Sequence, residues 1–473
     1  NTLAAATRAE RQSCAIMKKV YSGHSRREFL RRSAVGILAA PYVMKSSVRG
    51  ASANGKLQHA CIGMGGMGVG DLHNFLQYPN LEVVAICDVD ENMLKSAAAK
   101  VPNARHYHDW REMLKKEGDR IDTVNVTVPD HMHFAIAWSA IQRGKHVYCQ
   151  KPMCHDVAEV RVLTEAAKAK GVVTQLGTQL ASMAGDRTTV QWLKSGVIGK
   201  VKHIYLSANR PGAVEAYRPE GPRPPKGEQP PSNLAWDLWL GTAPERPYVP
   251  HLYHPVKWRG WLDFGTGWSG DIGCHIFDAV WKGLGLKPPK RVVAKVQESW
   301  KNSPARRADT WPQANHITWY FPGNDLTEGS ELPVEWFDGE FWAPREIRAL
   351  YSVEDYPTES AMIIGTEGAL LNPLGGTPLL LPEDKFKQVA RPKFDNRNHY
   401  HHFLDAVRGG PMCVSHFGQT GPMTEAILLG TVAVRLPETV LEWDHGSMRI
   451  VNNSDANKLL QRRYRSGWSF ARF

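Results

Sequence analysis

Apolar strand-like runs alternate with helical stretches from Lys56 to Thr178. The run "KLQHACIGMG" is almost continuously apolar and ends in glycines, and "MGVGDLHNFLQ" then begins a helix. The alternation continues through "LEVVAICDVD", "ENMLKSAAAK", "DTVNVTVP", "HFAIAWSAIQRG", "KHVYCQKP", "DVAEVRVLTEAAKAKG" and "VVTQLGT". Such alternation is typical of a parallel sheet with helices on both faces. The pattern therefore predicts a doubly wound α/β domain over residues 54–175.

The strict alternation stops after residue 178. "VKHIYLSANR" and "RVVAKVQESW" predict strands of antiparallel character. Between them, residues 211–263 are irregular and rich in proline and tryptophan. A loop of this length is usually functional or disordered, and its aromatic content argues against disorder. We expect this segment to form a loop layer around a site in a second domain, residues 176–473.

The first 53 residues have the pattern of an export signal. "SRREFLRR" at residues 25–32 contains an arginine pair, "AVGILAA" at 34–40 is a short apolar run, and Ala51-Ser52-Ala53 is a small-residue cleavage site. This order predicts a twin-arginine signal, removed near Ala53, and a periplasmic or otherwise exported protein. The twin-arginine export machinery carries folded proteins, so any cofactor would be bound before export.

The net charge changes little about the expected partners. The chain carries +11, but residues 1–53 hold ten Lys and Arg against two Asp and Glu, which leaves +3 for the remainder. We therefore expect no nucleic-acid partner, and no later segment is apolar enough to predict stable membrane insertion. No C-x-x-C pair occurs, which favours buried packing thiols over a disulfide framework for Cys61, Cys87, Cys149, Cys154, Cys274 and Cys413.

A glycine motif connects the first strand to the first helix. Residues Gly63–Gly68 read G-x-G-x-x-G, the motif whose strand–turn–helix context predicts dinucleotide binding. Asp88 follows the second strand, 20 residues later, where a carboxylate accepts bonds from ribose hydroxyls and repels a 2′-phosphate. We therefore expect NAD, with NADP less favoured. The predicted cofactor contacts in this part are Gly63, Gly65, Gly66, Met67, Gly68 and Asp88.

Two further stretches contain candidate reactive groups. Lys151 lies in "CQKPM" at the carboxyl end of a predicted parallel strand, where ligands bind. Asp271 and His275 are four residues apart in "GTGWSGDIGCHIFDAVWKGL" and share one face if this segment is helical. From the residues alone, a solvated lysine and a structural histidine are equally good interpretations.

These motifs together resemble the Gfo/Idh/MocA oxidoreductases. The resemblance rests on Gly63–Gly68, "TVPDHMH" at Thr127–His133, Lys151–Pro152 and "DIGCHIFD" at Asp271–Asp278. It implies an N-terminal Rossmann domain and a C-terminal α/β domain built on an open, mostly antiparallel sheet. Substrate would lie between that sheet and the nicotinamide. The tryptophan-rich loop and the C-terminal "YRSGW" resemble an exported subgroup of the family.

The resemblance also implies roles for the site residues. His275 would act as acid/base, and Asp271 would orient it or accept a bond from a second substrate hydroxyl. Lys151 would lie beside the nicotinamide and stabilise developing alkoxide charge. Pro129 and His133 would face the cofactor, with a helix-terminal histidine as the alternative for His133.

Two positions depart from the family pattern. Gln150 replaces the usual glutamate before Lys151, which we expect to make the lysine easier to deprotonate. Asp130 stands where asparagine is more usual. The cluster "NHYHHF", with His399, His401 and His402, lacks the further ligands of a metal centre, so we expect no metal.

Three functions compete. The first is an NAD-dependent oxidoreductase acting on a hydroxyl of a sugar, glycoside or polyol. The second is an NAD-dependent glycosidase, a known variation on this fold, in which transient oxidation at C3 permits elimination of the aglycone. The third is a sugar-binding protein that has lost the chemistry, which the joint presence of Lys151, Asp271 and His275 disfavours. An open sheet face further predicts a homo-oligomer.

Overall fold

A six-stranded parallel sheet forms the N-terminal part of the structure, a computed structural model that describes residues 55–211, 222–395 and 397–469. Its strand order is β3-β2-β1-β4-β5-β6. This is the order of a Rossmann fold, in which ligands bind beyond the carboxyl ends of the strands where the order reverses, here between β1 and β4. The predicted signal segment lies outside the described residues.

The predicted alternation of strands and helices is confirmed in this part. The strands are β1 (Leu57–Ile62), β2 (Leu81–Cys87), β3 (Arg105–Tyr107), β4 (Thr123–Val126), β5 (His146–Cys149) and β6 (Thr174–Leu176). The helices are α3 (Met67–Leu76), α4 (Glu91–Ala98), α5 (Trp110–Glu117), α6 (Asp130–Gln142) and α7 (Val157–Lys170). The sequence pattern missed β3, which is short and largely exposed, and α5. Since β6 ends at Leu176, the predicted domain boundary after residue 175 falls inside this strand.

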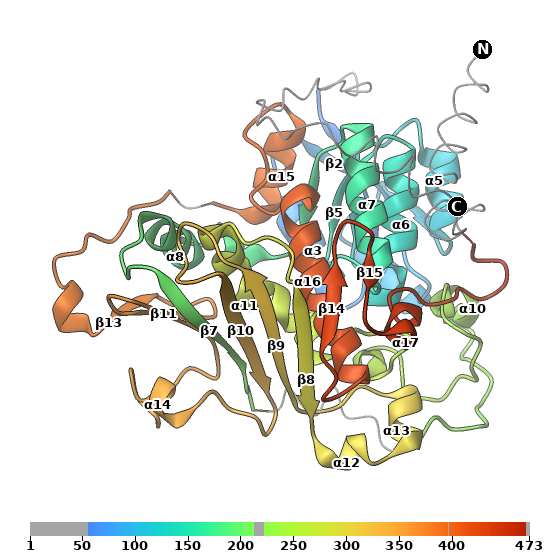
Figure 1. The fold of residues 1–473 in the computed structure, drawn as a ribbon. Coiled ribbons are helices and arrows are strands. Elements are labelled where there is room, and N and C mark those ends of the chain that lie inside the picture. Colours follow the sequence, from blue (N-terminus) through green and yellow to red (C-terminus); the bar gives the residue numbers. More distant parts are fainter. Residues whose placement is uncertain (1–54, 212–221, 396, 470–473) are drawn as a thin grey trace.

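The second sheet has nine strands in the order β13-β12-β11-β7-β10-β9-β8-β14-β15 (Figure 1). β7 and β10 run parallel and the other neighbours run antiparallel, so the expected mostly antiparallel sheet is confirmed. Burial alternates strictly along β9, because one face of the sheet packs on the core. Helices α11 and α16 pack against this buried face.

The elements of the C-terminal part have the following bounds. The strands are β7 (Val201–Ala208), β8 (Arg291–Val296), β9 (Asn315–Pro322), β10 (Glu331–Asp338), β11 (Glu359–Gly365), β12 (Ala369–Pro373), β13 (Leu379–Leu381), β14 (Leu441–Asp444) and β15 (Arg449–Ile450). The helices are α8 (Ala184–Ser195), α10 (Trp236–Leu240), α11 (Gly267–Leu284), α12 (Glu298–Lys301), α13 (Pro304–Asp309), α14 (Arg345–Arg348), α15 (His399–Val407), α16 (Phe417–Arg435) and α17 (Ser454–Lys458). Short 3₁₀ turns occur at η1 (Gln179–Ser182), η2 (Lys257–Gly260) and η3 (Glu383–Phe386).

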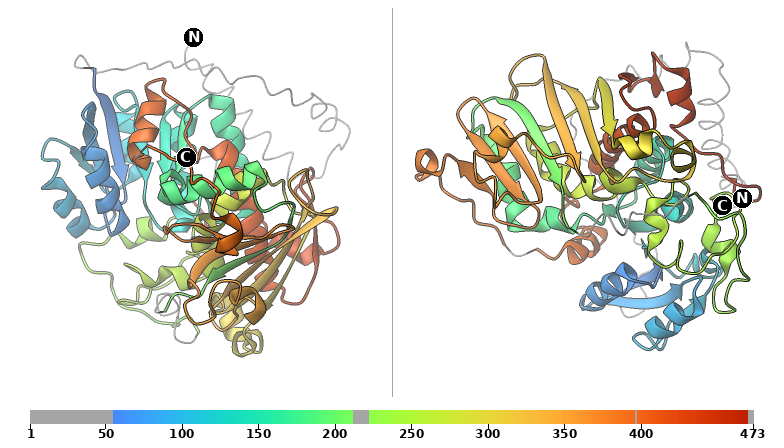
Figure 2. Two further views of the ribbon diagram at one scale, coloured as in Figure 1. Left: turned by 90° about the vertical axis from the view of Figure 1, so that its left-hand side faces the viewer. Right: turned by 90° about the horizontal axis from the view of Figure 1, so that it is seen from below.

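The end of the chain returns to the Rossmann domain and joins the two parts (Figure 2). Helix α16 packs against α7 as well as against α11 and β8, and α15 packs against α3. Beyond α17, Arg462 donates to Asp156 (3.0 Å) and Glu159 (3.1 Å), two buried carboxylates at the start of α7. One hydrophobic core therefore runs through both sheets, which fixes the position of the groups between them.

The tryptophan-rich segment folds as a packed layer. It forms α10 and η2, and a separate buried cluster contains Trp239, Tyr253, Trp258, Trp261 and Phe264. These residues are at most 6% exposed. Packing, rather than stacking on a sugar, is therefore the role the structure gives to these side chains.

The six cysteines of the described residues are buried and free, as expected for packing thiols. Within the same residues, no helix combines the length and the apolar character needed to cross a bilayer.

Candidate active site

The glycine turn after β1 is fixed by close backbone packing. Gly63 has φ +88°, and a Cβ there would lie 2.1 Å from the carbonyl oxygen of Thr127 at the end of β4. A Cβ on Gly68 would lie 2.0 Å from the carbonyl oxygen of Gly63. Both positions therefore exclude any larger residue, as expected for a tight turn and a close helix–strand approach.

Gly65 and the start of α3 leave room for a ligand instead. The atom nearest to a Cβ on Gly65 would belong to the Met93 side chain, at 3.7 Å, so the protein itself does not require glycine there. Gly66 is the N-cap of α3 and makes no side-chain cap, and Met67, the first helical residue, is 48% exposed. The Gly68 N–H donates to the Gly65 carbonyl oxygen at 2.9 Å, so the Met67 N–H is the group at the start of α3 that a phosphate could reach. These residues fit a bound dinucleotide.

Asp88 lies at the end of β2, beside the same turn. Its carboxylate accepts a hydrogen bond from the Met64 N–H (2.5 Å) and another from the Asp90 N–H (2.8 Å). Burial raises the pKa of Asp88, and these backbone bonds oppose that effect. The side chain therefore supports the glycine turn, and its predicted contact with the ribose hydroxyls stays a prediction.

The structure brings Lys151, Asp271 and His275 together from two different domains. Lys151 follows β5, whereas Asp271 and His275 lie one turn apart on α11, whose helical form is confirmed. The Lys151 Nζ is 2.5 Å from the Asp271 Oδ1 and 3.3 Å from the Asp271 carbonyl oxygen. The side chains of this ion pair are 16% and 6% exposed.

This ion pair opposes the effect expected from Gln150, which was to make Lys151 easier to deprotonate than a neighbouring glutamate would. Burial alone would lower the pKa of Lys151, but the Asp271 carboxylate outweighs burial and raises it. The sequence showed only the adjacent residue, Gln150, whereas the compensating carboxylate lies 120 positions further along the chain. Lys151 is therefore held as an ammonium group.

Gln150 itself binds another carboxylate. Its Nε2 donates to both oxygens of Asp71 on α3, at 2.9 and 3.1 Å. Thr127 and Tyr400 also donate to Asp71, at 2.7 and 2.8 Å. Burial raises the pKa of Asp71 to about 6. A glutamate at position 150 would face this buried carboxylate, so the amide is the residue that Asp71 accommodates.

His275 is a neutral imidazole at the edge of this cluster. Burial and the nearby Lys151 lower its pKa to about 3. Its Nδ1 is buried and has no hydrogen-bond partner within the part of the chain that the structure describes. Because buried polar atoms are normally paired, an unpaired nitrogen beside a charged pair indicates a group that awaits a ligand. Asp271 makes no hydrogen bond to this Nδ1, so the structure does not show Asp271 orienting His275 through that atom.

Sequence reasoning missed Arg259 and gave Asp130 no role. The Arg259 Nε lies 3.6 Å from the Asp271 Oδ2, and its guanidinium stacks on Trp258. Asp130, at the start of α6, accepts bonds from the backbone N–H and hydroxyl of Thr266. Burial and the neighbouring Asp271 raise its pKa to about 7. Aspartate in place of the usual asparagine at position 130 could have indicated a functional residue. Nothing in the sequence distinguished Arg259 from other arginines in irregular segments.

Residues that follow β4 support the turn that carries Lys151. Pro129 is the N-cap of α6. The Nδ1 of His133 lies 2.6 Å from the Pro152 carbonyl oxygen, and its Nε2 lies 2.8 Å from that of Val128. Burial lowers the pKa of His133 to about 4, so the neutral ring donates to one of the two carbonyls. The ring thus holds the turn after Lys151, and cofactor contacts of Pro129 and His133 stay predictions.

His399, from the histidine cluster noted in the sequence, lies outside this group of residues. Both ring nitrogens of His399 are used, by the Ser182 hydroxyl (2.8 Å) and the Leu176 carbonyl oxygen (2.8 Å).

Glu359, at the start of β11, brings the large sheet to the site. Its Oε1 lies 3.6 Å from the Arg210 Nε. Burial raises the pKa of Glu359, and the positive charge of Lys151 acts to lower it. The sheet therefore meets the site, as expected for a substrate held between the two domains.

Two family models match the chain consecutively. "Oxidoreductase family, NAD-binding Rossmann fold" matches residues 57–178, and "Oxidoreductase family, C-terminal alpha/beta domain" matches residues 190–313. Together they span half of the chain. The protein belongs to the Gfo/Idh/MocA family. Its N-terminal part is an NAD-binding Rossmann domain, so the predicted fold class and cofactor are confirmed.

Similar proteins in this family differ in their named activities. D-apiose dehydrogenase from Paraburkholderia graminis is 27% identical over 30% of this chain and 38% of its own length. A glycosyl hydrolase family 109 protein from Streptomyces niveus is 34% identical over 23% of each chain. This chain spans less than half the length of the curated relatives that it matches.

A solved structure shows the same fold over most of the chain. The WlbA dehydrogenase from Bordetella pertussis, in complex with NADH and UDP-GlcNAcA, matches with a TM-score of 0.56. The match covers 82% of this chain and 99% of that protein at 15% identity. At this identity the likeness concerns the fold alone.

Proposed function

We propose that this protein transfers hydride between a tightly bound NAD and a hydroxyl of a sugar, glycoside or polyol. The observation that carries the proposal is the Lys151–Asp271 ion pair, with the unpaired Nδ1 of His275 one helical turn away. This cluster lies beyond the carboxyl ends of the NAD-binding strands, where ligands of this fold bind. Dehydrogenases among the relatives support the same class of reaction.

The side chains divide the chemistry of an alcohol oxidation. Bound NAD would supply the hydride acceptor. Lys151 donates a hydrogen bond to the reacting oxygen and stabilises the charge that develops there, because Asp271 keeps it protonated. His275, neutral at pH 7, accepts the hydroxyl proton as the hydride leaves the same carbon. Arg259 balances the charge of Asp271 and presents a second cation to the substrate.

The test is cofactor reduction in the purified holoprotein, followed at 340 nm while a panel of sugars, glycosides and polyols is added. Lys151→Met should lower the rate by about 10²- to 10³-fold, because it removes one donor to the developing alkoxide. Lys194→Met, an exposed lysine on α8, is the matched control and should leave the rate unchanged. Wild-type protein that binds sugars without reducing the cofactor would support the non-catalytic alternative and overturn the proposal.

A glycosidase is the second candidate, and Asp130 is the observation that favours it. Elimination of an aglycone needs an additional acid or base, and the pKa of Asp130, raised to about 7, suits that exchange near neutral pH. The family 109 relative points the same way. Release of aglycone without net change in the cofactor would select this function. A ketone product formed in proportion to NADH would select the oxidoreductase.

The expected export of the protein implies that its NAD is tightly bound. A periplasm without a free NAD pool requires that hydride pass to a second substrate or return to the first. We propose that NAD is loaded before passage through the twin-arginine machinery. Replacing Arg26 and Arg27 by lysine should retain the protein in the cytoplasm, as measured by cell fractionation. Mature wild-type protein should release NAD only on denaturation, and rapid exchange of the cofactor would contradict this.

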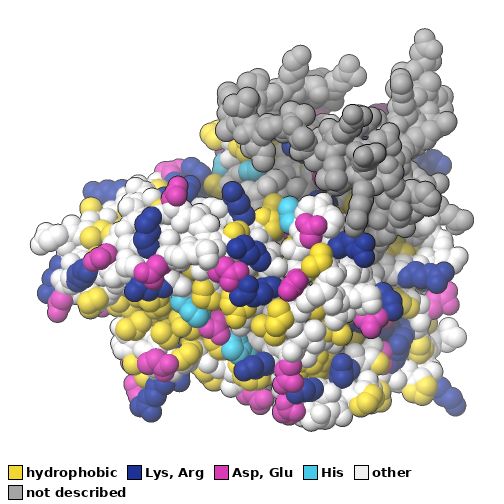
Figure 3. Space-filling model, in the orientation of Figure 1, with side chains coloured by type: hydrophobic (Ala, Val, Ile, Leu, Met, Phe, Trp, Pro, Cys, Tyr) yellow, Lys and Arg dark blue, Asp and Glu magenta, His cyan; other side chains and the backbone are white. Residues whose placement is uncertain are grey.

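We also propose a homo-oligomer formed through the outer face of the large sheet. Half-buried aromatic and charged side chains gather there, including the stacked rings of His203 and Tyr205 and the Glu335 carboxylate between His203 and His316 (Figure 3). Light scattering of the wild type should give a multiple of the chain mass, and Tyr205→Lys should reduce it. An unchanged mass in the variant, or a monomeric wild type, would contradict this interface.

A further inference from the structure

One segment of the second domain is fastened to the Rossmann domain beside the NAD site. Residues 233–242, which we call the crossing segment, contain the short helix α10 and belong to the tryptophan-rich layer. The start of this segment pairs with the loop that follows β2. The Glu91 N–H donates to the Asn233 carbonyl oxygen at 2.8 Å, and the Ala235 N–H donates to the Val89 carbonyl oxygen at 2.9 Å.

A side chain reinforces this pairing. The Asn233 Nδ2 donates to the Asp90 Oδ1 at 2.9 Å, and Asp90 and Leu234 form an antiparallel backbone pair. Asp90 follows Asp88, the predicted ribose ligand, by two residues. The crossing segment is therefore anchored on the side of the NAD site where the adenosine ribose would lie.

The other end of the crossing segment contacts the start of α6, which follows β4. The His131 Nε2 lies 3.0 Å from the Trp239 carbonyl oxygen, and the Thr242 hydroxyl donates to the His131 carbonyl oxygen at 2.8 Å. A Cβ on Gly241 would lie 2.1 Å from the Sδ of Met132, so the backbone approaches α6 closely here. The segment is thus fastened at the ends of two strands, β2 and β4.

The C-terminal tail holds the crossing segment from outside. Arg465 donates to the carbonyl oxygens of Asp237 and Gly241, at 2.7 and 2.9 Å. These bonds stabilise α10 between its two attachments.

The strand order decides what lies beneath this segment. In the parallel sheet β1 lies between β2 and β4, so the ends of β2 and β4 are two strand spacings, about 10 Å, apart. The five residues of α10 cover about 7 Å of this distance. A chain attached at both ends must pass beyond the carboxyl end of β1, whose turn contains Gly63–Gly68. The crossing segment therefore spans the crevice in which the pyrophosphate of NAD would bind.

The glycine turn itself stays open beneath this segment. A Cβ on Gly66 would meet nothing within 4 Å, and the atoms nearest to a Cβ on Gly65 belong to Met93. Met67 is 48% exposed. The crossing segment thus passes over the turn without packing on it, which is the arrangement that encloses a ligand between the two.

We propose that the crossing segment encloses bound NAD, so that the cofactor enters or leaves only after residues 233–235 detach from the loop that follows β2. This proposal rests on the tight binding of NAD proposed above and assigns it to particular residues. Joining the domains does not require the contact at β2, because α15, α16 and Arg462 already connect them. Opening of such a segment sets the rate at which an enclosed ligand is released.

The experiment is exchange of bound NAD in the purified holoprotein. The holoprotein is mixed with an excess of isotope-labelled NAD, and mass spectrometry follows replacement of the unlabelled cofactor. Asn233→Ala removes the amide that donates to Asp90. Ala235→Pro removes the N–H that donates to Val89, at a φ of −77° that proline adopts. Each variant should exchange NAD about tenfold faster than the wild type.

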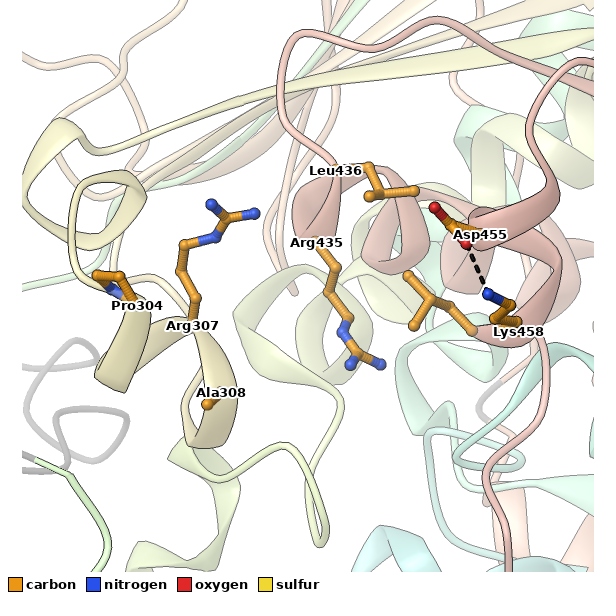
Figure 4. A pocket seen from close by; sticks show the side chains of 8 residues that line it. Pro304, Arg307, Ala308, Arg435, Leu436, Asp455 and Lys458 are labelled. Carbon is orange, nitrogen blue, oxygen red and sulfur yellow. Dashed lines mark hydrogen bonds and ion pairs between the residues drawn. The ribbon is translucent and has the colours of Figure 1, made fainter.

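Two control variants remove comparable bonds elsewhere on the surface. Asn302→Ala removes an amide–carboxylate bond to Glu298 (3.2 Å) at the end of α12. Lys458→Ala removes the ion pair with Asp455 (2.7 Å) on α17, beside the open groove at the end of α16 (Figure 4). Both controls should exchange NAD at the wild-type rate.

The affinity for NAD separates enclosure from damage to the site. Easier opening speeds uptake as much as release, so the Kd of both variants should equal that of the wild type. Loss of a direct contact with NAD would instead speed release alone and raise the Kd. Uptake is measured with labelled NAD and protein that has been unfolded, freed of cofactor and refolded.

The outcomes distinguish this proposal from those above. Wild-type exchange rates in both variants would overturn the enclosure and leave tight binding standing, whereas rapid exchange in the wild type would overturn both. Faster exchange with a matching rise in Kd would also overturn the enclosure. If Ala235→Pro fails to fold by circular dichroism, Asn233→Ala decides. None of these outcomes depends on hydride transfer.

Discussion

Two glycines of the same motif, Gly65 and Gly68, should respond to alanine in opposite ways. The added Cβ of Gly68→Ala would lie 2.0 Å from the carbonyl oxygen of Gly63 and 2.8 Å from its carbonyl carbon. Backbone must move by more than 1 Å to relieve this contact, which should cost about 1–3 kcal/mol of the free energy of unfolding. The Cβ of Gly65→Ala meets only Met93, at an ordinary 3.7 Å, and should leave stability unchanged.

Affinity for NAD should show the reverse order. The Cβ of Gly65→Ala points into the space where the pyrophosphate would approach the backbone. Loss of one hydrogen bond to a charged group costs about 1.5–3 kcal/mol, which is a Kd about ten to a hundred times higher. In Gly68→Ala, any loss of affinity should follow from the displaced turn and accompany the loss of stability.

The measurements are urea unfolding followed by circular dichroism, and calorimetric titration of NAD into protein that has been unfolded, freed of cofactor and refolded. Unfolding must be compared in the absence of NAD, because bound ligand itself stabilises the folded state. The reasoning fails if Gly65→Ala binds NAD as tightly as the wild type. It also fails if Gly65→Ala loses as much stability as Gly68→Ala.

Three further perturbations test the charges between and around the domains. Asp271→Asn should lower the free energy of unfolding in urea by about 3 kcal/mol, and by more than Lys151→Met does, because it removes the carboxylate that faces both Lys151 and Arg259. Equal losses in the two variants would contradict this. Arg462→Met should cost about 3 kcal/mol, since two buried carboxylates lose their partner, and should speed proteolysis of the C-terminal segment; unchanged proteolysis would argue against its role in joining the domains. Burial lowers the pKa of His59 to about 3, below the 6.5 of the unfolded chain, so its contribution is present above pH 6.5 and lost as pH falls toward 3. Wild-type stability should therefore fall by about 2 kcal/mol more than that of His59→Gln between pH 7 and pH 5, and parallel pH curves would refute this.

Much of the candidate site was predictable because its motifs are local. The glycine turn depends on a motif of six consecutive residues, Gly63–Gly68, and its strand–turn–helix context is visible in the apolar pattern. The shared face of Asp271 and His275 follows from helical spacing. The protonation state of Lys151 could not be predicted from its neighbours along the chain, because it depends on a carboxylate from another domain. The partner of Gln150 was invisible for the same reason, since Asp71 lies 79 positions away.

The sequence by itself determined most of the alternation of strands and helices in the N-terminal domain, the dinucleotide turn and the identity of the reactive side chains. These features depend on periodicity and on contacts between near neighbours in the chain. Only the tertiary structure decided which charges meet. It placed Asp271 against Lys151, Arg259 against Asp271 and Asp71 against Gln150, and it left Nδ1 of His275 without a hydrogen-bond partner among the described residues. Charge pairing and desolvation depend on distances across the folded core, which the pattern of residues along the chain does not contain.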